Sequence, residues 1–369
     1  MTWFDLTTGY LIGTAIWSAS LFVALIVLLK MRRGSDEIPI RKKLVNAAIS
    51  LWLLCVLMTL LEVGFAVGYD RTDSFNMSNV SKKWFRKYAE PEEKVLRFGP
   101  NEGIVYRDVK PFPESIPENA KHICFLGDSF TYGHGINHSA DRFSNLVGQN
   151  LEKDSGEETI VTNLGKPGTD LFWAESILRK LFEDDIRVDT AVYNLCLNDI
   201  ESFHPDFQTF YSADWLSGSD FFLFRDTYFF NLLYFRVQQA QRPQVKNYYD
   251  FMSEYYAGDP WKRMKQKLVA IRELCEQNGC EFRLVIFPFL HNLGNDYAFA
   301  SAHEQIVEFC RENNIPVEDL LPVMQEHSAE GLIVSRFDAH PNELANRYAA
   351  DSIFEWLTKK KAMTEETDQ

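Results

Sequence analysis

The sequence predicts an α/β protein whose parallel sheet is covered by helices on both faces, preceded by two transmembrane helices. From residue 121 onward, short apolar runs of strand length alternate with segments of helix length. Strands separated by helices indicate a parallel sheet between two helical layers. Ahead of this region, residues 9–29 and 44–67 form two apolar segments. At a rise of about 1.5 Å per residue, each is long enough to cross a bilayer.

The α/β domain is predicted to span residues 121–360. Its strands are expected at residues 122–126, 159–164, 188–195, 280–288 and 315–317, and its helices at 141–154, 170–184, about 260–279, 302–312 and 342–359. Ser139 is a predicted helix cap, and Pro260 and Gly279 are expected to bracket the third helix. A polar tail follows at residues 361–369.

The two apolar segments and the basic loop between them predict an integral protein of the plasma or inner membrane. A signal peptide is the competing interpretation of the first segment, but Asp5 and no basic residue precede it. Two buried core helices are the other alternative. The positive-inside rule keeps the basic loop in the cytoplasm and places the α/β domain outside. The loop residues are Lys30, Arg32, Arg33, Arg41, Lys42 and Lys43, and a competing basic group beyond the second span is Lys82, Lys83, Arg86 and Lys87.

Two further regions lie outside the strand–helix alternation. Residues 69–120 are polar with a Pro-rich end, and we expect a connector that packs on the α/β domain. Residues 200–256 are unusually rich in aromatic side chains and directly follow a strand, so they predict an inserted lid over the carboxyl edge of the sheet. The rings concerned include Phe203, Phe207, Phe210, Tyr211, Trp215, Phe221, Phe222, Phe224, Tyr228, Phe229, Phe230, Tyr234 and Phe235.

Residues Gly127, Asp128 and Ser129 directly follow the first strand. This order places the Ser129 hydroxyl on a tight turn at the carboxyl end of a sheet, where open α/β folds bind ligands. A serine nucleophile needs a base and a group that orients the base. His340, at the start of the last helix, is the predicted base, and Asp338 is the predicted orienting acid.

Oxyanion donors are predicted from the loops after the first three strands. They are the backbone N–H of Ser129, the backbone N–H of Gly168 and the side-chain amide of Asn198. Asp128 and Asp199 are predicted supporting residues. Each of these residue types is also common in ordinary turns, but they occupy three successive strand ends.

In this set of residues the sequence resembles the SGNH, or GDSL, hydrolase family. The four blocks of that family carry Ser, Gly, Asn and a final Asp–His pair, which correspond in order to Ser129, Gly168, Asn198 and Asp338/His340. The resemblance covers about residues 95–360 and includes residues 101–103 and 107–108 ahead of the first block. It implies a flavodoxin-like three-layer α/β/α sandwich and ester hydrolysis or acyl transfer through an acyl-serine. Two positions depart from the pattern: Cys196 replaces a glycine, and Asp338 lies two residues before His340, where three is usual.

These observations predict a membrane-anchored serine esterase or O-acyltransferase that needs no cofactor and no metal. Its expected substrates are ester-linked acyl groups, with cell-envelope glycans first among them. A lipid esterase or lysophospholipase is the alternative, and a glycan-binding protein without turnover is another. The net charge of −14 disfavours nucleic acid as a partner. His134 is expected to be an exposed loop residue, and Cys275 and Cys280 are expected to be free thiols, with a disulfide as the alternative.

Overall fold

The computed structural model describes residues 6–34, 39–72, 78–98, 102–154, 158–205, 218–242, 247–294 and 296–367, and the side chains of the last helix as far as residue 359. The chain forms two compact units. Unit 1 contains the described residues of Met1–Asp70, Phe75–Lys83 and Asp214–Ala240. Unit 2 contains those of Arg71–Ser74, Trp84–Ala213 and Gln241–Gln369.

Unit 2 is built on a five-stranded parallel sheet in the order β4-β3-β5-β6-β7. The strands are β3 (Lys121–Gly127), β4 (Thr159–Asn163), β5 (Thr190–Cys196), β6 (Glu281–Phe287) and β7 (Val317–Asp319). Renumbered from the first strand, this is the 2-1-3-4-5 order of flavodoxin-like folds. The predicted fold class is therefore confirmed, and the direction of the chain reverses between β3 and β5, where such folds bind their ligands.

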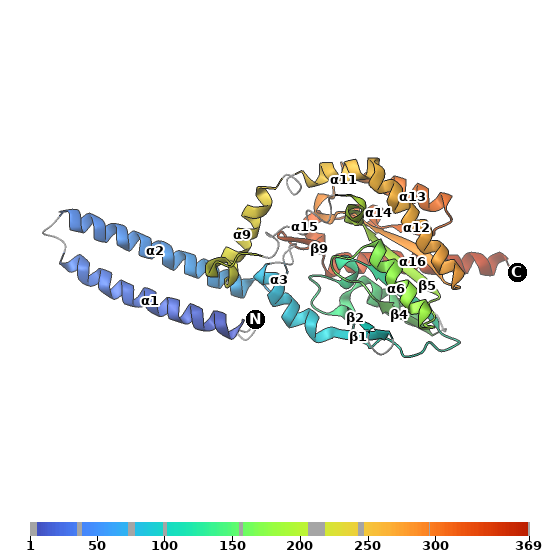
Figure 1. Cartoon of the computed structure of the whole chain (residues 1–369), viewed down its shortest axis with the longest axis horizontal. Helices are drawn as coiled ribbons and strands as arrows, with labels where there is room; N and C mark the ends of the chain where they lie inside the picture. Colours follow the sequence, from blue (N-terminus) through green and yellow to red (C-terminus); the bar gives the residue numbers. More distant parts are fainter. Residues whose placement is uncertain are drawn as a thin grey trace. The chain divides into compact units, whose positions relative to one another are not determined.

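Two layers of helices cover this sheet. Helices α5 (Phe143–Asp154) and α16 (Glu343–Thr367) pack together, and α6 (Leu171–Glu183) and α12 (Asp259–Gln277) pack together. The chain moves from β3 to β4 in one direction along the sheet and toward β7 in the other. Right-handed crossovers then place α5 and the later connecting helices on opposite faces (Figure 1). This is the predicted three-layer arrangement.

Unit 2 contains further strands and helices around this sheet. They are β1 (Glu93–Phe98), β2 (Glu102–Arg107), β8 (Ile333–Ser335), β9 (Asp338–Pro341), α4 (Ser129–Tyr132), α11 (Tyr248–Ala257), α13 (Ala300–Glu312), α14 (Leu321–Gln325) and α15 (Ala329–Leu332), with a 3₁₀ turn, η5, at Leu197–Phe203. Leu96, Phe98 and Tyr106 of the β1–β2 hairpin are buried in the main core. The later part of the predicted connector is thus packed into the α/β unit.

Some sequence boundaries were wrong. The first helix begins at Phe143 and not at residue 141, because Ser139 starts a separate 3₁₀ turn and so does not cap it. Strand β7 is shifted to Val317–Asp319. Helix α16 continues through Thr367, into the predicted tail. All six cysteines are free, Cys275 and Cys280 included, as the sequence favours.

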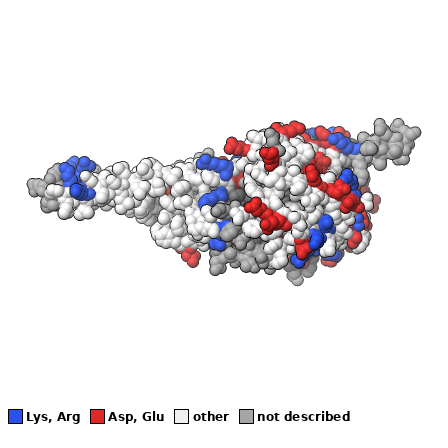
Figure 2. Space-filling model, turned by 90° about the horizontal axis from the view of Figure 1, so that it is seen from above, with Lys and Arg blue, Asp and Glu red and all other residues white. Residues whose placement is uncertain are grey.

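Unit 1 contains the two long apolar helices, α1 (Thr8–Arg33) and α2 (Pro39–Gly68), which include the predicted spans. They run antiparallel, because the Trp17 indole N–H donates to Thr59 (2.8 Å) while that of Trp52 donates to the carbonyl of Leu21 (2.8 Å). Among the described residues, both are long and apolar enough to cross a membrane. Figure 2 shows basic side chains gathered at the tip of this hairpin and an uncharged surface next to the tip.

The predicted aromatic lid is divided between the two units. Its described part after residue 217 contains α8 (Phe222–Arg225) and α9 (Phe229–Ala240), which belong to unit 1 together with α3 (Asn79–Trp84) up to Lys83. Its first residues and α11 belong to unit 2. Four of the predicted rings, at positions 207, 210, 211 and 215, lie outside the described residues. The described part of the segment in which the lid is predicted is thus shared between the two units.

Candidate active site

Ser129 lies at the sharp turn that ends the central strand β3. Gly127 has a φ of +150°, and a Cβ at this position would collide with the Thr131 hydroxyl and with the carbonyl of Asn194. Only glycine fits this turn without strain. The side chain of Asp128 then caps α4 by accepting the N–H of Phe130 (2.8 Å). The turn places Ser129 at the carboxyl edge of the sheet, as the sequence predicts.

A chain of hydrogen bonds joins Ser129, His340 and Asp338. The Ser129 Oγ lies 2.8 Å from the Nε2 of His340, and the His340 Nδ1 lies 2.5 Å from the Oδ1 of Asp338. Because a carboxylate only accepts, the Nδ1 carries the proton and the Nε2 lone pair accepts the serine hydroxyl. This is the tautomer in which imidazole serves as a general base toward serine.

The short spacing between Asp338 and His340 is explained by strand geometry. Both residues are on β9, and side chains two positions apart in a strand lie on the same face. The Oδ1 of Asp338 also accepts the backbone N–H of His340 at 3.0 Å. A spacing of two residues on a strand therefore brings Asp338 into contact with His340, where the pattern that the sequence resembles has a spacing of three.

Thr72 forms a hydrogen bond with Asp338 that the sequence did not indicate. Its hydroxyl donates to the Oδ2 of Asp338, so both carboxylate oxygens are engaged. The adjacent Arg71 forms a two-pronged ion pair with Glu343 at 2.9 and 3.0 Å, which fixes this stretch on α16. Burial alone would raise the pKa of Asp338, but the His340 ring and these hydrogen bonds hold it below its usual range. Asp338 is thus held as the ionised partner of His340.

We expect Thr72→Ala to lower kcat of the full-length protein by about tenfold, because a buried carboxylate loses a hydrogen bond worth about 1–3 kcal/mol. Thr72→Ser, which keeps the hydroxyl, should recover most of the activity. Thr358→Ala is a matched control, since the Thr358 hydroxyl bonds only within α16. Steady-state kinetics on a nitrophenyl ester measures the effect, and an unchanged kcat in Thr72→Ala would show that the bond is dispensable.

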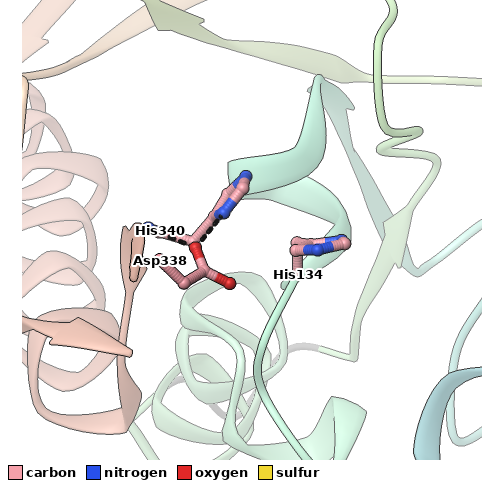
Figure 3. A group of neighbouring side chains, drawn as sticks. All are labelled: His134, Asp338 and His340. Carbon is pink, nitrogen blue, oxygen red and sulfur yellow. Dashed lines mark hydrogen bonds and ion pairs between the residues drawn. The ribbon is translucent and has the colours of Figure 1, made fainter. Parts of the chain in front are cut away.

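His134 is buried and lies against His340, contrary to the expectation of an exposed loop residue. Its side chain is packed between Trp84 and His340, with ring centroids 5.0 and 4.6 Å away. The residue is 4% exposed, and neither ring nitrogen makes a hydrogen bond to any residue that the structure describes. Figure 3 shows its ring beside the bonded Asp338–His340 pair. Burial, and then the charge of His340, lower the pKa of His134 to about 3.

His134, Asp338 and His340 also form a group whose potential ligand atoms all lie within 4.8 Å of one another. Both nitrogens of His340 and both oxygens of Asp338 are already engaged in the hydrogen bonds described above. A metal ion there would have to displace the bonds that link the serine to its base. The group is therefore best described as a triad with a neutral histidine packed against it.

Lowering the pH should destabilise the folded chain, because His134 binds a proton more readily in the unfolded chain than in the folded one. Because its pKa is about 3 in the folded chain and near 6.5 when unfolded, the unfolded chain binds the proton between these values. The contribution of His134 to the free energy of unfolding is constant above about pH 6.5. It falls by about 1.4 kcal/mol for each pH unit between that value and about pH 3. We expect His134→Phe, which cannot titrate, to lose less Tm than wild type between about pH 7 and pH 5 in thermal melts of the full chain. His138→Gln, at an exposed position, is the control; equal slopes in wild type and His134→Phe would contradict the prediction.

The predicted oxyanion residues flank the serine in the sheet. Gly168 lies in the loop after β4 and Asn198 in η5 after β5, and β4 and β5 are the two neighbours of β3. The loop of Gly168 is tied to the end of β3, because the N–H of Lys166 donates to the carbonyl of Gly127 at 3.0 Å. We expected glycine at 168 for a close approach, but a Cβ there would meet open space. Its φ of +71° is the reason for glycine.

Two buried carboxyl groups support these loops. Asp199 accepts the Tyr193 hydroxyl at 2.8 Å and the N–H of Cys196 at 3.3 Å. Asp128 interacts with the side chain of Asn198, and burial raises its pKa to about 6. Burial and the charge of Asp128 raise the pKa of Asp199 well above its usual range. The two carboxyls therefore act mainly as hydrogen-bonding supports under the strand ends.

Cys196 stands where the resemblance would place a glycine, and the backbone there is not distorted. Its backbone has a φ of −94° and a ψ of 142°, an extended conformation that any residue adopts. The side chain is 1% exposed and belongs to the main core. Glycine is therefore not required at this position.

Arg107, which precedes the Ser129 turn in the sequence, holds the loop after α4 in place. Its buried guanidinium donates to the carbonyls of Gly133 (3.1 Å) and Ile136 (2.9 Å) and pairs with Glu92. Burial lowers its pKa, and Glu92 opposes this shift. The loop held in this way carries His134, whose backbone N–H donates to the carbonyl of Ser129 at 2.9 Å.

No protein-family model matches this sequence, and no curated protein matches it. Among solved structures, a two-domain esterase active on acetylated mannans is similar at 16% identity and a TM-score of 0.41, over 66% of this chain and half of that one. TesA is similar at 13% identity and a TM-score of 0.42, over 65% and 99% of the two chains. A lipolytic protein of the G-D-S-L family from Veillonella parvula is similar at 18% identity and a TM-score of 0.37, over 64% and 97%.

Proposed function

We propose that this chain is an SGNH-type serine hydrolase that cleaves ester-linked acyl groups and is anchored in a membrane. The observation that carries the proposal is the continuous set of hydrogen bonds from the Ser129 hydroxyl through His340 to Asp338. It is supported by the position of Ser129 at the reversal point of a flavodoxin-like sheet, between the loops of Gly168 and Asn198.

In the proposed reaction the Ser129 Oγ attacks the ester carbonyl carbon while the His340 Nε2 takes the hydroxyl proton. Asp338 holds the resulting imidazolium. The negative charge on the carbonyl oxygen is stabilised by the N–H groups of Ser129 and Gly168 and by the Asn198 amide. When the C–O bond of the ester breaks, His340 returns the proton to the departing alcohol and an acyl-serine remains.

The second half of the reaction repeats the first with a different nucleophile. Water, deprotonated by His340, releases the acid and restores Ser129. If a sugar hydroxyl takes the place of water, the acyl group is transferred instead. The topology expected from the positive-inside rule places unit 2 outside the cytoplasm, and this supports ester-linked acyl groups of cell-envelope glycans as the substrate class.

Labelling of the full-length protein with a fluorophosphonate tests the proposal. The reagent phosphonylates only an activated serine, so we expect a single adduct on Ser129, located by peptide mass spectrometry, together with release of nitrophenol from a short-chain nitrophenyl ester. His340→Ala should prevent both, because it removes the base. A folded protein that shows neither labelling nor ester cleavage would be a binding protein and would overturn the proposal.

A further inference from the structure

Residues 218–240, termed here the return segment, are attached to the two apolar helices of unit 1. Glu62 of α2 accepts the backbone N–H groups of Tyr228 (2.7 Å) and Phe229 (2.8 Å), where α9 begins. The ring of Tyr228 lies edge-on against Tyr10 of α1, with centroids 5.0 Å apart. Figure 1 shows α9 beside the end of α2. The chain thus comes back to the helical hairpin after completing three strands of the sheet.

Helix α9 buries two polar side chains alongside Leu232 and Phe235, and it leaves two aliphatic side chains exposed. Asn231 and Gln239 are buried, at 3% and 6% exposure, while Leu233 and Val237 are exposed at 44% and 45%. The buried Asn231 is held by the backbone N–H of Asn79, at 2.6 Å. Leu233 and Val237 are four residues apart and share one face. A helix in water buries its apolar face, so this arrangement fits a helix whose outer face meets an apolar medium.

The position of the return segment along α2 agrees with this conclusion. Glu62 lies about 9 Å before the end of α2 at Gly68, at a rise of about 1.5 Å per residue. Aromatic residues gather at this level, as they do at membrane boundaries: Phe229 lies against Phe65 with centroids 6.0 Å apart. Phe221 and Phe222 are 52% and 61% exposed.

We infer that the return segment is a third membrane-contacting element, which lies at the boundary between lipid headgroups and acyl chains. The bilayer is the occupant of its outer face, because α9 packs against α2 and belongs to the same unit as the exposed apolar side chains of α1 and α2. Phe221, Phe222, Leu233 and Val237 enter the lipid. The inference rests on the membrane anchoring of the proposed function and is independent of the catalytic chemistry.

Spin labelling of the full chain in vesicles of phosphatidylethanolamine and phosphatidylglycerol tests this inference. Single labels are placed at Phe222→Cys and Val237→Cys in a Cys55→Ala background, since the other five cysteines are buried. Power saturation compares collisions with lipid-soluble oxygen and with a water-soluble nickel chelate. Leu57→Cys on α2 is the lipid reference, and Lys262→Cys on the exposed surface of unit 2 is the water reference.

The expected result is an oxygen-to-nickel collision ratio at both sites several-fold above that at position 262 and close to that at position 57. A ratio like that at position 262 would place the return segment in water and overturn the inference. Low collision rates with both reagents would mean that protein covers these side chains, as a lid would require, and would overturn it as well. If position 57 itself reports water, the anchoring in the proposed function fails.

Discussion

Replacing Ser129 by alanine is expected to lower kcat toward nitrophenyl esters by at least about 10⁴-fold. The change removes the hydroxyl that lies 2.8 Å from the His340 Nε2, and no acyl-serine can form without it. KM should change little, because the methyl group leaves the strand end and the flanking loops in place. Steady-state kinetics on the full-length protein in detergent measures the effect.

Ser352→Ala provides the matched control for this variant. The hydroxyl of Ser352 on α16 donates to Glu318 on β7, and its loss should leave kcat unchanged. Thermal melting of both variants checks that they are folded. A Ser129→Ala protein as active as wild type would exclude the proposed nucleophile, and with it the acyl-serine.

Asp338→Asn is expected to lower kcat by about 10²–10⁴-fold with little change in KM. The asparagine side chain is uncharged, so it stabilises the imidazolium that forms when Ser129 loses its proton less than the carboxylate 2.5 Å from the Nδ1 does. Rate measurements across the pH range should show that the loss persists well above the pKa of imidazole.

Asp351→Asn, an exposed carboxylate on α16, is the control for the change of charge and should retain wild-type rates. If Asp338→Asn also retains them, Asp338 merely fills space beside His340. In that case Thr72→Ala should leave kcat unchanged too, because the Thr72 hydroxyl donates to the same carboxylate.

The central sheet could be predicted from the sequence because each of its strands is a short apolar run between helices of ordinary length. All five predicted strands are present, four of them nearly in place. The placement of Ser129 next to the loops of Gly168 and Asn198 was also predictable, because the carboxyl ends of neighbouring parallel strands meet at one edge. His340 lies on β9, in a separate antiparallel pair, and was predicted instead from its proximity to Asp338 in the sequence and from the family resemblance. The catalytic roles of these residues remain predictions that the proposed experiments test.

Other features could not be deduced because they depend on tertiary contacts without a local pattern. Thr72 is an ordinary threonine in a polar connector, and only the folded chain brings it to Asp338. His134 stands between two glycines, a context typical of exposed loops, yet Trp84 from the connector covers it. The aromatic segment predicted burial of rings, but composition does not say whether protein or lipid surrounds them.

The path of the chain between the two units bears on how proteolysis would release the α/β unit from the proposed membrane anchor. The described chain belongs to unit 1 up to Asp70, to unit 2 at Arg71 and Thr72, to unit 1 at residues 78–83, and again to unit 1 at residues 218–240. A protease that cuts the connector once would leave the α/β unit covalently joined to α9, which Glu62 still holds. Release would thus require a second event, the extraction of α9 from its place beside α2. Cleavage ahead of Thr72 would leave the hydrogen bond from Thr72 to Asp338 on the released chain. Cleavage after Thr72 would remove it.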